Sequence, residues 1–228
     1  MTVERATELA FRGDLDRALN AIARIPRSDD ARWLRAYVAS ARGRFSEAER
    51  TLVSLRTGSE DPVILAKAAV TLGSVLRQTE RHGEARAIER DAFTRAPSEE
   101  FRAHLSIGLA ADAVGLGELA EVDAMLRRVG ARPPGGWRAI VRMQWVRCER
   151  NLLAGRPAAA AGHARKALDA SRRAAARRHA AKSNLFLGVS LLEAGRAADG
   201  RRALGLALLG ANKIGARPIA SVAERLLR

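Results

Sequence analysis

The sequence has little sulfur and few aromatic rings. Its 228 residues include one cysteine, Cys148, and aromatic residues make up 4% of the chain. A single cysteine excludes an intrachain disulfide framework and fits a reducing compartment. Hydrophobic residues still make up 47% of the chain, mostly as Ala, Leu and Val. That composition favours closely packed helices over a β-sandwich, so we expect an all-α fold.

Long apolar runs are also missing. No stretch approaches the roughly 20 apolar residues that a membrane span needs. Near the start, Glu4, Arg5 and Glu8 stand where a signal peptide would require an unbroken apolar segment. We therefore expect a soluble, cytoplasmic protein with no membrane contact.

Acidic residues become scarce in the second part of the chain. Residues 1–136 hold 21 Lys/Arg and 20 Asp/Glu, whereas residues 137–228 hold 19 Lys/Arg and 5 Asp/Glu. The change falls at the segment 132–136, Arg-Pro-Pro-Gly-Gly, which is the strongest loop signal in the chain. Such asymmetry suggests an acidic partner. The alternative is an Arg-rich genomic bias, because only four of the forty basic residues are Lys.

One short motif recurs along the chain: a turn residue, usually Gly, followed by a helix start and a small residue, usually Ala. The turn positions, 30 to 40 residues apart, are Gly13, Gly43, Glu80, Gly117, Gly155 and Gly195. Each lies between two segments with apolar residues at helical spacing. A Gly just past a helix takes the left-handed conformation that ends it. The pattern predicts helix pairs repeated about six times.

This pattern resembles the tetratricopeptide repeat (TPR), in particular the degenerate bacterial units found in large transcriptional regulators. The third unit carries the resemblance best, with Leu72-Gly73, Ala85, Ala92 and Pro97. The resemblance implies a right-handed superhelical solenoid of about six helix-turn-helix units with a C-terminal capping helix. Units 1–4 would span 1–132, and units 5–6 plus the cap would span 137–228 of one continuous solenoid. It implies a scaffold and no enzyme.

Residues for chemistry are not grouped in the sequence. The four histidines are far apart and lack metal-ligand spacing. The pairs Asp29-Asp30, Glu60-Asp61 and Glu99-Glu100 lie at expected helix starts, where acids cap amides. Cys148 falls on a packing position and is expected to be a buried structural thiol. We predict no catalytic residue, cofactor or metal.

A partner would bind the concave surface, which the first helix of each unit lines in the family that this chain resembles. Trp145, flanked by arginines, is either an anchor for the partner or packs against the neighbouring unit. The predicted groove residues are Trp33, Tyr37, Lys67, Arg77, His104, Arg138, Arg142, Trp145, Glu149 and Lys182.

A second basic surface is predicted from the tract around residue 170. If 158–180 is one helix, a single broad face carries Arg165, Lys166, Arg172, Arg173 and Arg177, while Arg178 points elsewhere. Such a stripe either neutralises phosphates or is simply a solvated face.

Three functions remain open from the sequence. The leading hypothesis is a non-catalytic protein-protein interaction scaffold that takes a peptide, a helix or an acidic protein in its groove. The alternative is a nucleic-acid-associated or transcription-regulatory protein that uses the basic C-terminal half. Self-association as a homodimer through the terminal repeat is a third possibility, because the last helix has an apolar face with Ile219, Val222, Ala223 and Leu226.

Overall fold

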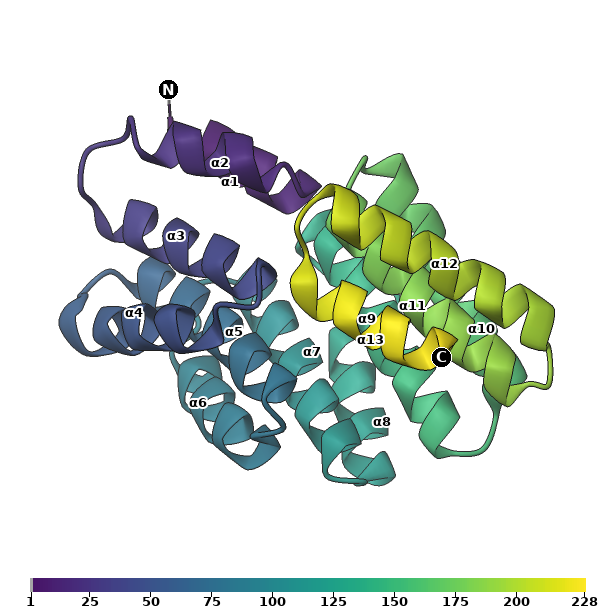
Figure 1. Cartoon of the computed structure of the whole chain (residues 1–228). Helices are drawn as coiled ribbons and strands as arrows, with labels where there is room; N and C mark the ends of the chain where they lie inside the picture. Colours follow the sequence, from purple (N-terminus) through teal and green to yellow (C-terminus); the bar gives the residue numbers. More distant parts are fainter. Residues whose placement is uncertain (1) are drawn as a thin grey trace.

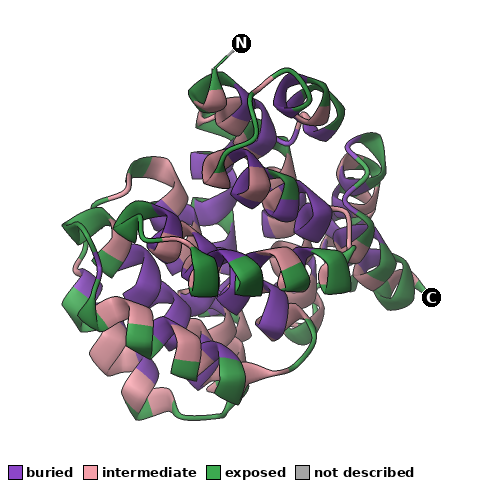
Figure 2. Ribbon diagram, turned by 90° about the vertical axis from the view of Figure 1, so that its left-hand side faces the viewer, coloured by how far each residue is buried: buried purple, intermediate pink, exposed green. Residues whose placement is uncertain are grey.

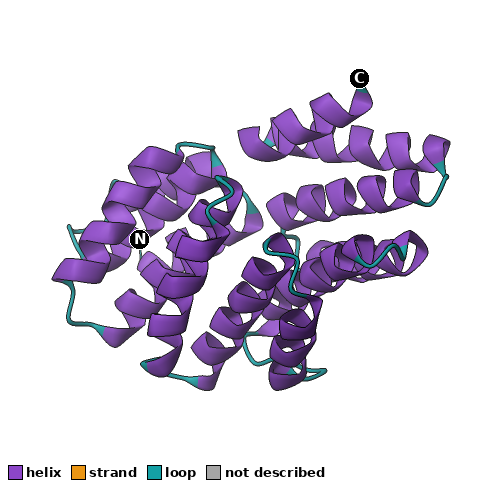
Figure 3. Ribbon diagram, turned by 90° about the horizontal axis from the view of Figure 1, so that it is seen from below, coloured by secondary structure: helices purple, strands orange, loops and turns teal. Residues whose placement is uncertain are grey.

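The computed structural model describes residues 2–228, which form thirteen α-helices and no strand (Figure 1). The helices are α1 (Val3–Arg12), α2 (Leu15–Ile22), α3 (Asp29–Ala41), α4 (Phe45–Gly58), α5 (Pro62–Gln78), α6 (His82–Thr94), α7 (Glu99–Gly115), α8 (Leu119–Val129), α9 (Gly136–Leu153), α10 (Pro157–Arg173), α11 (Arg177–Glu193), α12 (Ala197–Lys213) and α13 (Arg217–Leu227). Figure 3 shows that short loops join them. The all-α prediction is confirmed.

Each predicted turn joins the two helices of one pair. All six turn residues have a positive φ: Gly13, Gly43, Glu80, Gly117, Gly155 and Gly195. Helices pack mainly on their neighbours along the chain, and successive pairs stack through α3, α5, α7, α9 and α11. This consecutive stacking is the arrangement of a helical-repeat solenoid.

Glu80 is the exception among these turn residues, because a side chain stands at φ 62°. For residues other than Gly the left-handed region costs roughly 1–2 kcal/mol. We expect Glu80→Gly to raise the free energy of unfolding by about 0.5–1 kcal/mol, after the extra entropy of Gly in the unfolded chain is subtracted. Urea unfolding measures this change.

The matched control is Gly117→Ala. At Gly117, φ is 77° and an added Cβ would meet nothing within 4 Å, so only backbone strain changes. It is expected to lower the free energy of unfolding by about 1 kcal/mol. A loss of stability in Glu80→Gly would contradict this account of the turn.

The predicted acidic starts are helix caps and first-turn residues. Asp61 accepts hydrogen bonds from the amides of Val63 and Ile64 at the start of α5. At α3 and α7 the caps are Ser28 and Ser98, and the acid pairs occupy the first turn. There they favour the positive end of the helix dipole.

Buried residues lie on the helix faces turned toward neighbouring helices, and exposed ones on the outer faces (Figure 2). Small residues allow the closest approaches. A Cβ on Gly188 would meet Leu204, and one on Gly200 would meet Leu192 and the Gly188 carbonyl oxygen. The Gly at position 200, where the repeat pattern expects Ala, therefore allows α11 and α12 to pack closely.

The two ends of the solenoid meet. Helix α1 contacts α11, and the first helix pair lies beside the α12–α13 connection in Figure 1. A Cβ on Gly13 would lie 2.9 Å from the backbone nitrogen of Arg178, and one on Gly43 would lie 3.2 Å from Pro218. The concave side therefore faces a partly open space between the two ends of the chain.

The expectation that 158–180 forms one helix is wrong. Helix α10 ends at Arg173 and α11 begins at Arg177, with Ala175 at φ 51° between them. Helix α13 ends the chain with Ile219, Ala220 and Ala223 buried, while Leu226 is exposed.

Candidate functional site

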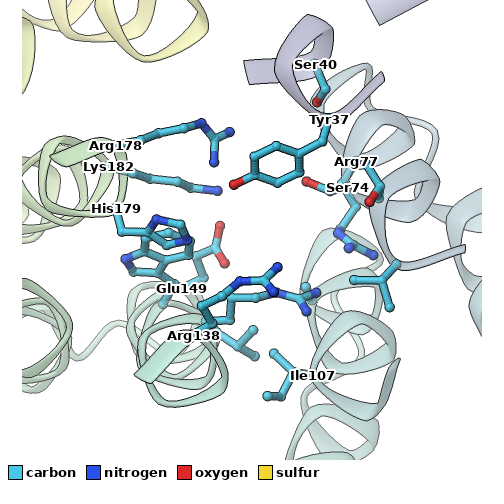
Figure 4. Close-up of a pocket in the computed structure, with 16 residues that line it drawn as sticks. Tyr37, Ser40, Ser74, Arg77, Ile107, Arg138, Glu149, Arg178, His179 and Lys182 are labelled. Carbon is cyan, nitrogen blue, oxygen red and sulfur yellow. The ribbon is translucent and has the colours of Figure 1, made fainter. Parts of the chain in front are cut away.

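A basic cavity of about 110 Å³ lies inside the closed solenoid (Figure 4). A buried water needs roughly 10–15 Å³, so this space takes several waters or one compact ionic group. Helices α3, α5, α7, α9 and α11 line it with Tyr37, Ser40, Val70, Thr71, Ser74, Arg77, Ile107, Ala111, Arg138, Arg142, Trp145, Val146, Glu149, Arg178, His179 and Lys182.

Four cations of this cavity lack a carboxylate partner. They come in pairs from two adjacent helices, Arg138 and Arg142 from α9, and Arg178 and Lys182 from α11. Within residues 2–228 no carboxylate oxygen lies within 4.0 Å of a side-chain nitrogen of these four. All four are half-buried, and charges withdrawn from water without a partner are costly, so natural proteins normally pair them.

The pKa values of the cations reflect this crowding. Burial, together with Arg178, Arg77 and Arg142, lowers the pKa of Lys182 to about 8 although Glu149 opposes the shift. Burial and the neighbouring Arg77 lower the pKa of Arg142 to about 10. The cavity thus disfavours its own positive charges and would bind an anion favourably.

The opposite wall supplies hydroxyl groups. Tyr37 and Ser40 come from α3 and Ser74 comes from α5. In Figure 4, the Tyr37 hydroxyl points across the cavity toward the side chains of Arg178 and Lys182. Cations on one wall and hydroxyl donors on the other can hydrogen-bond one anionic group from both sides.

The fifth cation, Arg77, belongs to a buried ion network. Its Nη1 lies 2.8 Å from Glu89 Oε2 and 2.9 Å from Asp112 Oδ1, and both acids are fully buried. Gly73 and Gly108 make room for the carboxylate, because a Cβ on either would overlap Glu89. Arg77 balances only one full negative charge, and burial raises the pKa of Asp112 to about 8. This network links α5, α6 and α7 at the wall of the cavity.

Aromatic rings hold the cationic wall in place. The Trp145 indole donates a hydrogen bond to Ser183 Oγ at 2.9 Å and stacks on His179, with ring centroids 5.4 Å apart. The Lys182 ammonium lies 4.7 Å from the centroid of the same indole. Trp145 therefore packs against the neighbouring unit, and its ring also forms part of the cavity wall.

The same arrangement, an indole that donates a hydrogen bond to a hydroxyl and lies beside a lysine, occurs earlier in the chain. The Trp33 indole donates to Thr71 Oγ1 at 2.9 Å, and the Lys67 ammonium lies 5.1 Å from the Trp33 ring centroid. Lys67 is also paired with Asp30 at 2.7 Å. Trp33 thus links its unit to the next one in the manner of Trp145.

Seven of the ten predicted groove residues line the cavity: Tyr37, Arg77, Arg138, Arg142, Trp145, Glu149 and Lys182. The other three lie nearby. Trp33 is buried in the core, Lys67 lines a separate pocket beside α1, and His104 is buried behind Arg142. Nδ1 of His104 accepts from Arg142 Nη1 at 3.0 Å. Burial, followed by Arg142 and Arg138, lowers the pKa of His104 to about 2.

Sequence reasoning missed Arg178 and His179. Arg178 was expected to point away from the basic stripe but was not placed in the groove, and its guanidinium faces the cavity. The repeat register contained the signal, because Arg178 holds the same place in its unit as Arg138 does in the preceding one. His179 follows it in a buried position between Trp137 and Trp145.

The second predicted basic surface lies outside the cavity. All five of its residues are exposed, on α10 and at the start of α11: Arg165, Lys166, Arg172, Arg173 and Arg177. Arg165 and Arg172 border a surface depression with Arg196 and Arg202. That depression also contains Asp169 and Asp199.

Other reactive groups are structural or scattered. Cys148 is buried beside Ser190, and burial raises the pKa of its thiol to about 11. Across residues 2–228, no cluster of three or more His, Cys, Asp and Glu side chains is placed to hold a metal ion. In the same range no helix has the length and apolar character needed to cross a membrane.

The buried ionisable groups predict a stability maximum near pH 6.5. Burial lowers the pKa of His104 and His179, so their folded forms resist protonation and stability rises with pH up to their unfolded pKa of about 6.5. The raised pKa of Asp112 acts oppositely, because the folded state keeps a proton that the unfolded chain has lost above about pH 4. The pKa values of His82 and His163 are also lowered by burial, and that of Glu149 is also raised by burial. The rising contributions of the histidines exceed the falling ones of the two acids below pH 6.5, and only the falling ones remain above it.

Urea unfolding across pH 5 to 8 would measure this profile. Asp112→Asn serves as the control, since it removes one of the two acids whose ionisation lowers stability above pH 6.5. An unchanged decline in that variant would contradict the assignment to Asp112.

Comparisons with known proteins leave the family open. No protein-family model matches the chain, and no curated protein matches it. Among solved structures, the apo form of RapI resembles it with 11% sequence identity and a TM-score of 0.45. The alignment covers 92% of this chain and 63% of RapI. A similarity this low carries no argument about function, and membership of the TPR family stays a prediction.

Proposed function

We propose that this protein is a non-catalytic helical-repeat scaffold that binds an acidic group of a partner protein in its inner cavity. One observation carries the proposal: Arg138, Arg142, Arg178 and Lys182 face a partly open cavity, and no carboxylate oxygen of residues 2–228 lies within 4.0 Å of their side-chain nitrogens. An acidic group placed among them would form charge-assisted hydrogen bonds that the protein itself does not supply.

The size of the cavity narrows the kind of partner. An α-helix is about 10–12 Å across with its side chains, and a space of about 110 Å³ does not take one. The occupant is therefore a single acidic side chain or a chain terminus, and the rest of the partner lies outside.

Titration calorimetry with short peptides tests this function. A peptide with one central Glu is compared with its Gln counterpart at constant ionic strength, for the natural protein and for Arg142→Met. Arg165→Met is the matched control, because Arg165 is an exposed arginine outside the cavity. Binding of the Glu peptide that is lost in Arg142→Met and kept in Arg165→Met supports the function. Binding that both variants retain rejects the cavity as the site.

The outer basic surface supports a second candidate, binding of nucleic acid. Its five cationic side chains are all exposed and can meet phosphates, although Arg177 Nη2 lies 3.9 Å from Asp14 Oδ2. DNA or RNA binding should then weaken steeply with salt, and replacing Arg172, Arg173 and Arg177 with Ala should flatten that dependence. Unchanged binding in the triple variant would reject this candidate.

Light scattering tests self-association through α13.

A further inference from the structure

The charge balance of the cavity indicates how much negative charge its occupant carries. Arg138, Arg142, Arg178 and Lys182 face one carboxylate, Glu149, while Arg77 is balanced by Glu89 alone because Asp112 beside it is protonated at neutral pH. The formal excess is three positive charges. A carboxylate occupant would leave two of them uncompensated, whereas a dianion would leave one.

The arrangement of donors agrees with a group that has more than two oxygens. Three guanidinium groups approach from α9 and α11, and each can offer two parallel N–H donors. The hydroxyls of Tyr37, Ser40 and Ser74 lie on the facing wall. A planar carboxylate presents two oxygens in one plane, but a phosphate monoester presents three in different directions. Donors on opposite walls therefore fit a phosphate better.

The outer surface offers no equivalent arrangement. In the depression between α10 and α12, Arg196 is already paired with Asp199, and Asp169 lies beside Arg165 and Arg172. Its basic residues thus have acidic neighbours, whereas the four cations of the inner cavity have no carboxylate within 4.0 Å in residues 2–228. The inner cavity is the more selective site for a compact dianion.

We propose that the inner cavity is a phosphate-monoester site, bound by Arg138, Arg142, Arg178 and Lys182 on one wall and by hydroxyl groups on the other. This inference rests on the proposed function and specifies the acidic group as a phosphoryl group. The two possible sources are a phosphorylated side chain of a partner protein and a free phosphate ester.

Titration calorimetry at constant ionic strength compares four probes: a short neutral peptide with one phosphoserine, the same peptide with Glu, the same peptide with Ser, and free O-phosphoserine. The phosphoserine peptide is expected to bind at least about tenfold more tightly than the Glu peptide, and the Ser peptide is expected not to bind. Arg142→Met and Lys182→Met should each reduce phosphopeptide affinity at least about tenfold, and Arg165→Met should leave it unchanged.

The pH profile supplies a readout that distinguishes a bound phosphate from a bound carboxylate. Phosphopeptide affinity should rise as the phosphate loses its second proton near pH 6. It should fall as Lys182, which faces Glu149, Arg178, Arg77 and Arg142, loses its proton above a pKa of about 8. Affinity for the Glu peptide should show only the fall.

The outcomes separate this inference from the function on which it rests. Equal affinity for the Glu and phosphoserine peptides overturns the phosphate assignment and leaves the proposed function standing. No cavity-dependent binding of either peptide overturns both. Equally tight binding of the peptide and free O-phosphoserine supports a free phosphate ester as the source, whereas binding of the peptide alone supports a phosphorylated partner.

Discussion

Arg142→Met is expected to weaken binding of an anionic ligand by roughly 10- to 100-fold, because a hydrogen bond to a charged group contributes about 1.5–3 kcal/mol. The same variant should keep or gain stability without ligand. Replacing a half-buried, poorly compensated charge with an apolar side chain of similar length is often neutral or stabilising. Losing the Arg142–His104 hydrogen bond costs about 1 kcal/mol, so we expect a net change between 0 and about +2 kcal/mol.

Calorimetric titration and urea unfolding of the same preparations measure both effects. Arg165→Met controls for the loss of one positive charge at an exposed site. If Arg142→Met binds the ligand more weakly and its free energy of unfolding is unchanged or higher, Arg142 is a binding residue whose charge destabilises the unliganded protein. A large loss of stability with unchanged affinity would instead identify a structural arginine, and the account of the cavity would be wrong.

Arg77→Met, unlike Arg142→Met, should lower the free energy of unfolding, and its effect on stability should be the largest of these variants. Its removal leaves Glu89 and Asp112 buried without a cation, and breaking a buried ion pair in this way costs about 3–5 kcal/mol. Adding Glu89→Gln should recover part of that loss, because no uncompensated charge then remains beside the protonated Asp112. Unfolding in urea near pH 7 measures both variants.

Comparing Arg77→Met with Arg142→Met distinguishes an arginine that has carboxylate partners from one that has none. Both arginines line the same cavity, but only Arg77 has carboxylate partners within 4.0 Å among residues 2–228. If Arg77→Met cost less than about 1 kcal/mol, the network of Arg77, Glu89 and Asp112 would not stabilise the fold. Equal losses in Arg77→Met and Arg142→Met would remove the distinction between paired and unpaired cations.

Local sequence signals predicted the repeat itself. The turn positions were found because Gly relieves left-handed backbone, and the structure places positive φ at all six of them, including Glu80. Capping explains the acid pairs near Ser28, Asp61 and Ser98 for the same local reason. Such signals depend on a few neighbouring residues, so one sequence is enough to show them.

The break within 158–180 was missed because its local signal is weak. The connection Ala174–Ala176 contains neither Gly nor Pro, and Ala is the best helix former. The chain turns there because Ala175 takes φ 51° between two helices that each pack on neighbours. Tertiary packing thus overrides the high helix propensity of these alanines. The resulting turn orients Arg178 toward the cavity.

The shape of the cavity depends on contacts between residues far apart in the chain. The groove residues were predicted unit by unit, but whether they face open solvent depends on rotations accumulated over all the units. The contact of Gly13 with Arg178 closes the ring between residues that no local pattern relates. Seven of the ten groove residues predicted from the sequence line the cavity, together with Arg178 and His179, which were not predicted.

The central claim is that the inner cavity binds a compact dianion. Crystals grown with selenate, a tetrahedral dianion of similar size to phosphate, test it through the anomalous scattering of selenium. We predict an anomalous peak within hydrogen-bonding distance of Arg142 and Lys182, and no such peak in crystals of Arg142→Met. Selenate peaks confined to the exposed arginines of α10, with none in the cavity of the natural protein, would contradict the account.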